Sequence, residues 1–203
     1  MTKAELQLVR SLAGKRGRTE TGLFVAEGAK LVGELRASHL RVRKIFALEG
    51  LFEGPEVECV TPRDMERLSL LKTASNSLAL VEIPRYRFDA AGAGRRLTLA
   101  LDQVQNPGNL GTIIRLADWF GIGDVVCSPD SADCFNPKVV QATMGAILRV
   151  RLHYTELDAL LADVKANPRR YVNVSVFGKK EPTETSRVKD SLRAARLRAR
   201  AAE

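Results

Sequence analysis

The chain has 203 residues, of which 45% are apolar and 28% are charged, a composition that excludes collagen-like and disordered proteins and predicts one large or two small folded domains. No stretch approaches the roughly 18 uninterrupted apolar residues of a membrane helix, and the start of the chain lacks the apolar segment of a signal peptide, so we expect a cytoplasmic protein with no membrane partner. Three cysteines and two histidines without zinc-type spacing exclude a disulfide scaffold and predict no metal site, while the net charge of +8 favours a polyanionic partner.

Residues 1–88 alternate helical and strand patterns, which predicts a first, small α/β domain. A helix begins after Thr2, because Thr2 and Glu5 have the spacing of a capping box. The segment LFVAEG predicts the first strand, and a second helix follows it. The other predicted elements are strands at KIFAL and VECV, a helix opened by Thr61 and Pro62, and a closing strand at SLALVEIP.

The segment GKRGRTETG separates the first helix from the first strand. Its three glycines predict a flexible, exposed loop. Lys15, Arg16 and Arg18 would then be available to contact phosphate groups of a polyanion. An ordinary solvated loop is the alternative interpretation.

A second domain follows the segment RYRFDAAGAGRR, which predicts an exposed linker at residues 89–97. Residues 98–178 give strands at LTLAL, DVVC, AILRVRL and YVNVSVF, separated by helical segments. Connections of this length favour a parallel sheet. Residues 179–203 carry half of the excess positive charge and predict a basic tail, which is either a solvated helix or an RNA-contacting extension.

The loop QVQNPGN lies between the strand LTLAL and the next helix, where open parallel sheets bind their ligands. In a purely structural interpretation, Asn106 and Pro107 form a turn, Asn109 caps the helix, and Gly108 and Gly111 relieve crowding. The segment contains neither a dinucleotide-binding nor a Walker phosphate motif, which argues against a nucleotide-binding metabolic enzyme.

The helix after this loop carries an arginine, Arg115, whose role the sequence leaves open. It either forms a surface ion pair with Asp118 or directs its planar guanidinium at a phosphate or a developing oxyanion. The helix is predicted to bury one apolar face, made of Ile113, Leu116, Ala117 and Phe120.

Two strings of the second domain resemble the SpoU/TrmH branch of the SPOUT RNA methyltransferases. The string NPGNLGTIIRLADWFGIGDVV resembles the first motif of that family, an asparagine followed six residues later by an arginine, here Asn109 and Arg115. The first domain resembles the family's substrate-binding domain, a small α/β fold akin to some ribosomal RNA-binding proteins, through GLFVAEGAKLVGEL and KTASNSLALVEIP. The string FNPKVVQATMGAILRV resembles a downstream segment through Asn136, Pro137, Lys138, Thr143 and Gly145.

The resemblance implies an α/β protein with a substrate-binding domain at 1–88 and a parallel-sheet SPOUT domain, an α/β knot, at 98–178. It also implies a homodimer that uses S-adenosylmethionine to methylate a ribose 2′-hydroxyl of rRNA or tRNA. In such an enzyme Arg115 would stabilise the oxygen as its proton leaves, and Asn109 would orient that arginine or the ribose. The residues that would contact RNA are Lys15, Arg16, Arg18 and Lys138.

The sequence departs from this family after YVNVSVFG. The family's G-x-E-G-x-G-like loop and its S-x-N-x-(S/A)-x-A segment, which form most of the cofactor pocket, are not found there. We therefore expect an incomplete SPOUT domain with cofactor-binding residues that cannot be named, and a truncated or altered end of the chain. The alternative function is that of a noncatalytic RNA-binding protein derived from such a methyltransferase.

Overall fold

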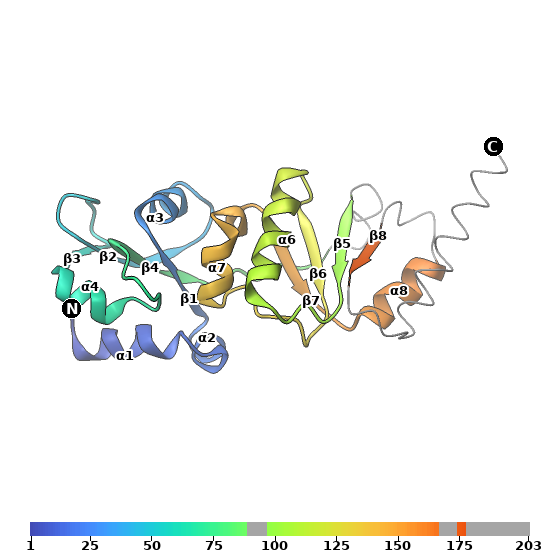
Figure 1. Cartoon of the computed structure of the whole chain (residues 1–203), viewed down its shortest axis with the longest axis horizontal. Coiled ribbons are helices and arrows are strands. Elements are labelled where there is room, and N and C mark those ends of the chain that lie inside the picture. The colour runs from blue at the N-terminus through green and yellow to red at the C-terminus, as the bar shows by residue number, and fades with distance from the viewer. Residues whose placement is uncertain (89–96, 167–173, 178–203) are drawn as a thin grey trace. The chain divides into compact units, whose positions relative to one another are not determined.

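The computed structural model describes residues 1–88, 97–166 and 174–177, with the side chains of 164–166 and 174–177 left aside. Figure 1 traces its elements along the chain. The chain folds into two compact units. The first unit consists of residues 1–85, 106–116 and 132–149, and the second contains the described residues of 86–105, 117–131 and 150–203. Residues 89–96 of the predicted linker and the whole predicted tail lie outside the described residues.

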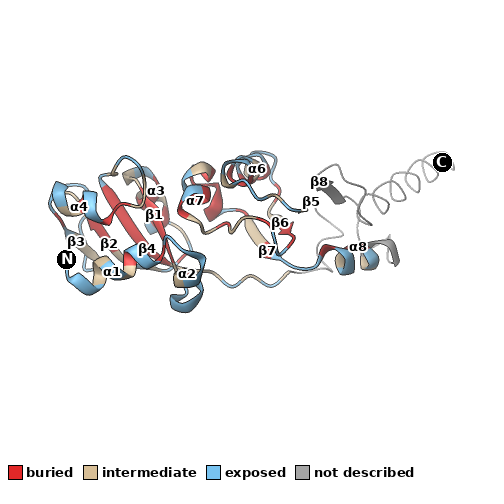
Figure 2. Ribbon diagram, turned by 60° about the horizontal axis from the view of Figure 1, so that its bottom comes forward, coloured by how far each residue is buried: buried red, intermediate tan, exposed pale blue. Residues whose placement is uncertain are grey.

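The first unit is built on a four-stranded sheet in the order β1-β4-β2-β3. Strand β4 pairs antiparallel with β1 and with β2, and β2 pairs in parallel with β3. Buried residues follow β1 and β4 over most of their length and β2 over its second half (Figure 2). The bounds are β1 (Leu23–Glu27), β2 (Val42–Ala47), β3 (Val57–Cys59) and β4 (Ser77–Glu82), so all four predicted strands of this part are confirmed.

Four helices of the first unit precede or connect these strands, namely α1 (Lys3–Ser11), α2 (Lys15–Thr21), α3 (Ala29–Arg36) and α4 (Pro62–Leu68). The capping box at the start of α1 is confirmed, because the Thr2 hydroxyl oxygen accepts a hydrogen bond from the Glu5 N–H and the Glu5 carboxylate accepts one from the Thr2 N–H. Helix α4 begins as predicted, with the Thr61 hydroxyl accepting from the Asp64 N–H and Pro62 in its first turn.

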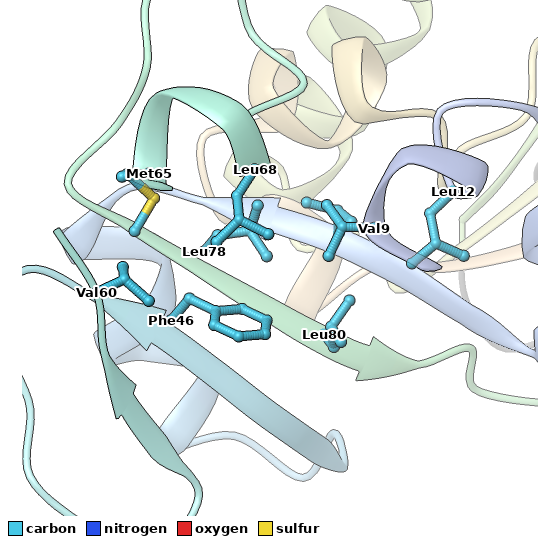
Figure 3. Close-up of a cluster of buried hydrophobic side chains, with 9 residues drawn as sticks. Val9, Leu12, Phe46, Val60, Met65, Leu68, Leu78 and Leu80 are labelled. Carbon is cyan, nitrogen blue, oxygen red and sulfur yellow. The ribbon is translucent and has the colours of Figure 1, made fainter. Parts of the chain in front are cut away.

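An apolar core lies between one face of this sheet and helices α1 and α4 (Figure 3). Phe46 and Leu78 are fully buried on the strands, where they meet Val9 of α1 and Leu68 of α4. Burial of each such large side chain contributes about 1.5–3 kcal/mol. The amphipathic pattern of α1 therefore serves to close this face of the sheet.

The predicted flexible basic loop is wrong, because the segment forms helix α2. Arg18 is 2% exposed and forms an ion pair with Asp133 at 2.7 Å, and its guanidinium also donates to the carbonyl oxygens of Leu12 and Ala13. A buried, fully bonded guanidinium cannot reach an RNA phosphate, so Arg18 is removed from the predicted RNA contacts. Glycine-rich sequence predicted mobility here, but a buried ion pair to a distant loop orders the segment.

The second unit contains a parallel sheet in the order β7-β6-β5-β8. Its strands are β5 (Thr98–Leu101), β6 (Asp124–Cys127), β7 (Arg151–Tyr154) and β8 (Val174–Phe177). The prediction of a parallel sheet after the linker is thereby confirmed. Helix α8 (Leu157–Ala166) places Leu157 and Leu161 against Ala100 and Val126 of the sheet.

One predicted strand of this sheet is shorter than expected. The pattern of AILRVRL predicted a strand throughout, but Ala146–Leu148 forms a 3-10 turn and β7 begins only at Arg151. Met144 and Gly145, which precede the 3-10 turn, both have positive φ (50° and 92°). The chain therefore turns sharply after the preceding helix, and the residues that follow the turn are not in an extended strand conformation until Arg151. Among the described residues, no helix is long and apolar enough to cross a membrane.

Candidate active site at the carboxyl ends of β5 and β6

The strand order of the parallel sheet reverses at β5. The chain proceeds from β5 to β6 and then to β7 on one side, whereas β8 pairs with β5 on the other side. Open α/β sheets bind ligands outside the carboxyl ends of the strands at such a switch point. The segment at that end of β5 is Asp102–Gln105, which leads directly into helix α6 (Pro107–Trp119). The sequence-based location of the site is thus consistent with the topology.

Two serines after β6 fix the backbone that leaves β5. The Gln103 N–H donates to Ser128 Oγ at 2.8 Å, and the Val104 N–H donates to Ser131 Oγ at 3.2 Å. Both serines are 5% exposed, and their hydroxyl oxygens lie 3.0 Å apart. Gln103 has a φ of 51°, a left-handed conformation that costs a non-glycine residue free energy and that clusters at functional sites. The bonds to the serines hold the loop in this strained shape.

Acidic side chains surround the same end of the sheet. Burial raises the pKa of the Asp102 carboxyl above its ordinary value, and the nearby negative charges of Asp130 and Asp158 raise it further, against a hydrogen bond with Ser128 that lowers it. Sequence reasoning did not single out these carboxylates. The available signal was their position, since Asp102 directly follows β5 and Asp130 lies in the loop after β6.

The structure corrects the assignment of the helix cap. The Asn106 side chain accepts a hydrogen bond from the Asn109 N–H at 3.1 Å, so Asn106 is the residue that caps α6. Asn109 lies inside the first turn, is exposed, and leaves its amide free of hydrogen bonds to described residues. The structural interpretation of Asn109 as the helix cap is therefore wrong, because Asn106 has that role.

The predicted buried face of α6 is wrong in part, because only Ala117 of its four predicted residues is fully buried. The fully buried residues are Leu110, Ile114 and Ala117, whereas Leu116 and Phe120, expected inside, are 51% and 71% exposed. Both sets recur at helical spacing, so periodicity alone could not choose between them.

Arg115 is exposed, as predicted. Within the described part of the chain its guanidinium forms no ion pair, with Asp118 or any other residue, and no hydrogen bond. A guanidinium that has no structural partner remains available for an external oxygen.

Asn109 and Arg115 share one helix but do not converge. Six residues correspond to a rise of about 9 Å and a rotation that leaves the two side chains about 120° apart around the helix axis. Their roles are therefore separate: one group lies in the first turn of the helix, and the other lies more than one and a half turns further along it.

The second resembling string forms helix α7 (Pro137–Thr143), which packs against α6 and β1. A Cβ added at Gly111 would lie 2.4 Å from the Ala142 Cβ, so Gly111 permits the close approach of α6 and α7, as its structural interpretation held. Thr143 is fully buried and bonded to a backbone carbonyl, and Gly145 has positive φ with Glu34 beside it. These two residues thus have structural roles, whereas Lys138 is exposed.

Comparison with known proteins assigns both parts of the chain to known families. The SpoU rRNA Methylase family model matches residues 96–195, and the MRM3-like substrate binding domain model matches residues 3–85. A solved structure described as an RNA methyltransferase of the TrmH family from Porphyromonas gingivalis is 35% identical, with a TM-score of 0.73, and covers 82% of this chain and 68% of its own. The chain belongs to the SpoU rRNA methylase family. The family match extends beyond residue 178, where the resemblance was expected to end.

Two further relatives of this SpoU family chain are informative. The 23S rRNA (guanosine(2553)-2′-O)-methyltransferase RlmP of Bacillus subtilis is 29% identical over 83% of this chain and 67% of its own length. The AdoMet-bound rRNA methyltransferase of Sinorhizobium meliloti is 25% identical, with a TM-score of 0.68, over 82% of this chain and 67% of its own. The chain spans only 37% of the length of the zebrafish mitochondrial rRNA methyltransferase 3A, to which it is 32% identical.

S-adenosylmethionine is the cofactor of this family, and the described residues suit it. The group carries a positive sulfonium, and the carboxylates at the ends of β5 and β6 provide a negative environment for a cation. The segments in which the family's remaining cofactor motifs were sought, beyond residue 178, lie outside the described residues. Within the described ranges, no group of three or more His, Cys, Asp or Glu side chains is arranged to hold a metal ion.

Proposed function

We propose that this chain transfers a methyl group from S-adenosylmethionine to a ribose 2′-hydroxyl of ribosomal RNA. The observation that carries the proposal is that Arg115, on the helix that follows β5 in the chain, is exposed and forms no ion pair or hydrogen bond with any described residue. Support comes from family membership and from relatives named as rRNA 2′-O-methyltransferases.

When bound, S-adenosylmethionine supplies the methyl group on a positively charged sulfonium. In this transfer the bond between the methyl carbon and sulfur would break as the bond between the methyl carbon and the ribose O2′ forms, which would leave a neutral thioether, and the hydroxyl proton would be released to water. A guanidinium offers hydrogen-bond donors and no acceptor, so the part of Arg115 is to stabilise the negative charge that develops on O2′ and not to remove the proton. Asn109 can both donate and accept hydrogen bonds through its amide, which suits it to orient the ribose.

The RNA contacts that we propose around this chemistry are Lys15, Arg16 and Lys138, all exposed. Arg16 also pairs with Glu20 at 2.6 Å, an exposed pair that an RNA phosphate could replace at little cost. These contacts are to the backbone and carry affinity without sequence specificity.

We further propose a cytoplasmic homodimer. The cytoplasmic location is supported by the similarity to a bacterial rRNA methyltransferase, that of Bacillus subtilis. Its interface is supported by the end of α6, where Leu116, Trp119 and Phe120 are 51%, 83% and 71% exposed. Large apolar side chains gathered on one helix end mark a surface for protein association.

The test is methyl transfer from labelled S-adenosylmethionine to a 23S rRNA transcript. Arg115→Ala should lower the rate by about 100-fold or more, as for the loss of one oxyanion-stabilising donor, with an unchanged melting temperature. Arg63→Ala, an exposed arginine on α4, is the matched control and should keep the wild-type rate. A 2′-O-methyl group also leaves a gap in an alkaline hydrolysis ladder, because the blocked oxygen cannot attack the next phosphate. Full activity of Arg115→Ala would refute the assigned role.

The alternative, a noncatalytic RNA-binding protein, is favoured by one observation, the departure from the family's cofactor motifs after residue 178. Isothermal titration with S-adenosylmethionine distinguishes the two functions. Binding together with methyl transfer supports the enzyme, whereas RNA binding without any cofactor binding supports the alternative.

A further inference from the structure

A groove in the first unit gathers arginines at one end of its sheet. It has a volume of about 610 Å³ and lies among the beginning of β1, the segment before β2 and the residues that follow β4. Its lining includes Arg41, Arg43 and Arg85, together with His39 and a single acidic residue, Glu82.

The backbone beneath these side chains is held by hydrogen bonds between the three segments. The Glu82 N–H donates to the Arg41 carbonyl at 2.9 Å, and the Ile83 N–H donates to the Gly22 carbonyl at 2.8 Å. Strand pairing continues directly from these bonds, with Val42 opposite Val81. The arginines thus project from a fixed frame, which lowers the entropy cost of binding a ligand along it.

The groove keeps a positive charge because its arginines outnumber their partners. Arg41 and Arg43 share Glu82, at 3.8 Å and 3.1 Å, and their side chains remain 77% and 61% exposed. Arg85 is exposed and forms no ion pair with any residue of the described ranges.

Two other arginines of the first unit each have a carboxylate to themselves. Arg36 pairs with Glu56 at 3.0 Å, and Arg67 pairs with Asp64 at 3.3 Å. The groove differs from these pairs in that three arginines line it together with one carboxylate.

We propose that this groove binds the sugar-phosphate backbone of the RNA substrate, an inference that rests on the proposed function. Guanidinium forks match the oxygens of a phosphate group, and three of them along an open groove suit successive phosphates of a strand better than one small anion. The groove lies in the part of the chain that matches a substrate-binding domain model. None of its arginines is among the contacts predicted from the sequence, so it is an additional RNA surface.

The experiment measures affinity for a 23S rRNA transcript by filter binding at several salt concentrations. The groove variant is Arg41→Gln/Arg43→Gln/Arg85→Gln. The control variant, Arg10→Gln/Arg63→Gln/Arg67→Gln, removes the same charge from exposed arginines on or beside α1 and α4. Each lost phosphate contact should lower the slope of log affinity against log salt by about 0.7 to 0.9, so the groove variant should lose about two to three units of slope and at least about tenfold in affinity.

Three results would overturn the groove as an RNA surface. The first is an affinity of the groove variant for RNA equal to that of the wild-type chain. The second is an equal loss of RNA affinity in the groove and control variants, and the third is the absence of RNA binding by the wild-type chain. Melting temperatures verify that both variants are folded. Failure of the groove is separable from failure of the proposed function, because a wild-type chain that methylates RNA while the groove variant binds normally refutes only the groove. A chain whose RNA binding depends on the groove but that transfers no methyl group refutes only the proposed reaction.

Discussion

Arg18 offers the sharpest test of how the first unit is held together. Its Nε and Nη2 donate to one carboxylate oxygen of Asp133 at 2.9 Å and 2.7 Å, and its Nη1 donates to the carbonyls of Leu12 and Ala13 at 2.6 Å and 3.0 Å. The Arg18 side chain is 3% exposed and that of Asp133 is 19% exposed. Arg18→Met would keep most of the apolar stem but would leave a carboxylate and two carbonyls without their donor.

Breaking one partner of a buried ion pair costs about 3–5 kcal/mol, since the remaining charge is left uncompensated. Asp133 is partly open to water, so we expect the lower end, about 3 kcal/mol, for Arg18→Met. Urea unfolding followed by far-UV circular dichroism measures this free energy. A double-mutant cycle with Asp133→Asn should show coupling, because the two side chains act on the same interaction.

Arg16 supplies the matched control on the same helix. It is paired with Glu20, but its side chain is 90% exposed, so Arg16→Met should cost at most about 0.5 kcal/mol. If Arg18→Met were as mild as Arg16→Met, or if it weakened RNA binding without loss of stability, the structural role of Arg18 would be refuted and the predicted phosphate contact restored.

Three further predictions concern packing, pH and capping. Gly111→Ala should destabilise the protein by about 1–3 kcal/mol in urea unfolding, because the new methyl group would lie 2.4 Å from a Cβ of α7. The hydrogen bond from Lys44 lowers the pKa of Glu5 to about 2, so the stability it contributes, up to about 1 kcal/mol, is present above pH 4.5 and is lost as the pH falls toward 2. Unfolding curves between pH 7 and pH 2.5 measure it, and Lys44→Met should reduce that pH dependence. Asn106→Ala should lower the free energy of unfolding by about 1 kcal/mol through loss of the cap, whereas Asn109→Ala should change it by less than about 0.5 kcal/mol.

Each of these has a clear contrary outcome. A neutral Gly111→Ala would mean that the two helices separate without cost. An unaltered acid transition in Lys44→Met would show that other carboxylates dominate acid unfolding. Equal losses for the two asparagine variants would return the cap function to Asn109.

Local chemistry made much of this fold predictable from the sequence. The Thr2 and Glu5 capping box and the start of α4 at Pro62 depend on residues within one turn of each other, so their spacing carries the information. The parallel sheet followed from strand patterns and connection lengths, and the position of the candidate site followed from the loop after β5. The family assignment likewise rested on contiguous strings of residues that include Asn109 and Arg115.

Tertiary contacts decided the rest, because they join residues whose distance along the chain carries no local signal. Arg18 and Asp133 are 115 positions apart, and only their pairing turns a glycine-rich segment into an ordered helix with a buried cation. Helix α6 offers two apolar faces of similar spacing, and the approach of α7 at Gly111 selects the one that contains Leu110 and Ile114. The sequence alone therefore determined most of the helices and strands and predicted where the candidate site lies, whereas packing determined which charges and which apolar faces remain available to a partner.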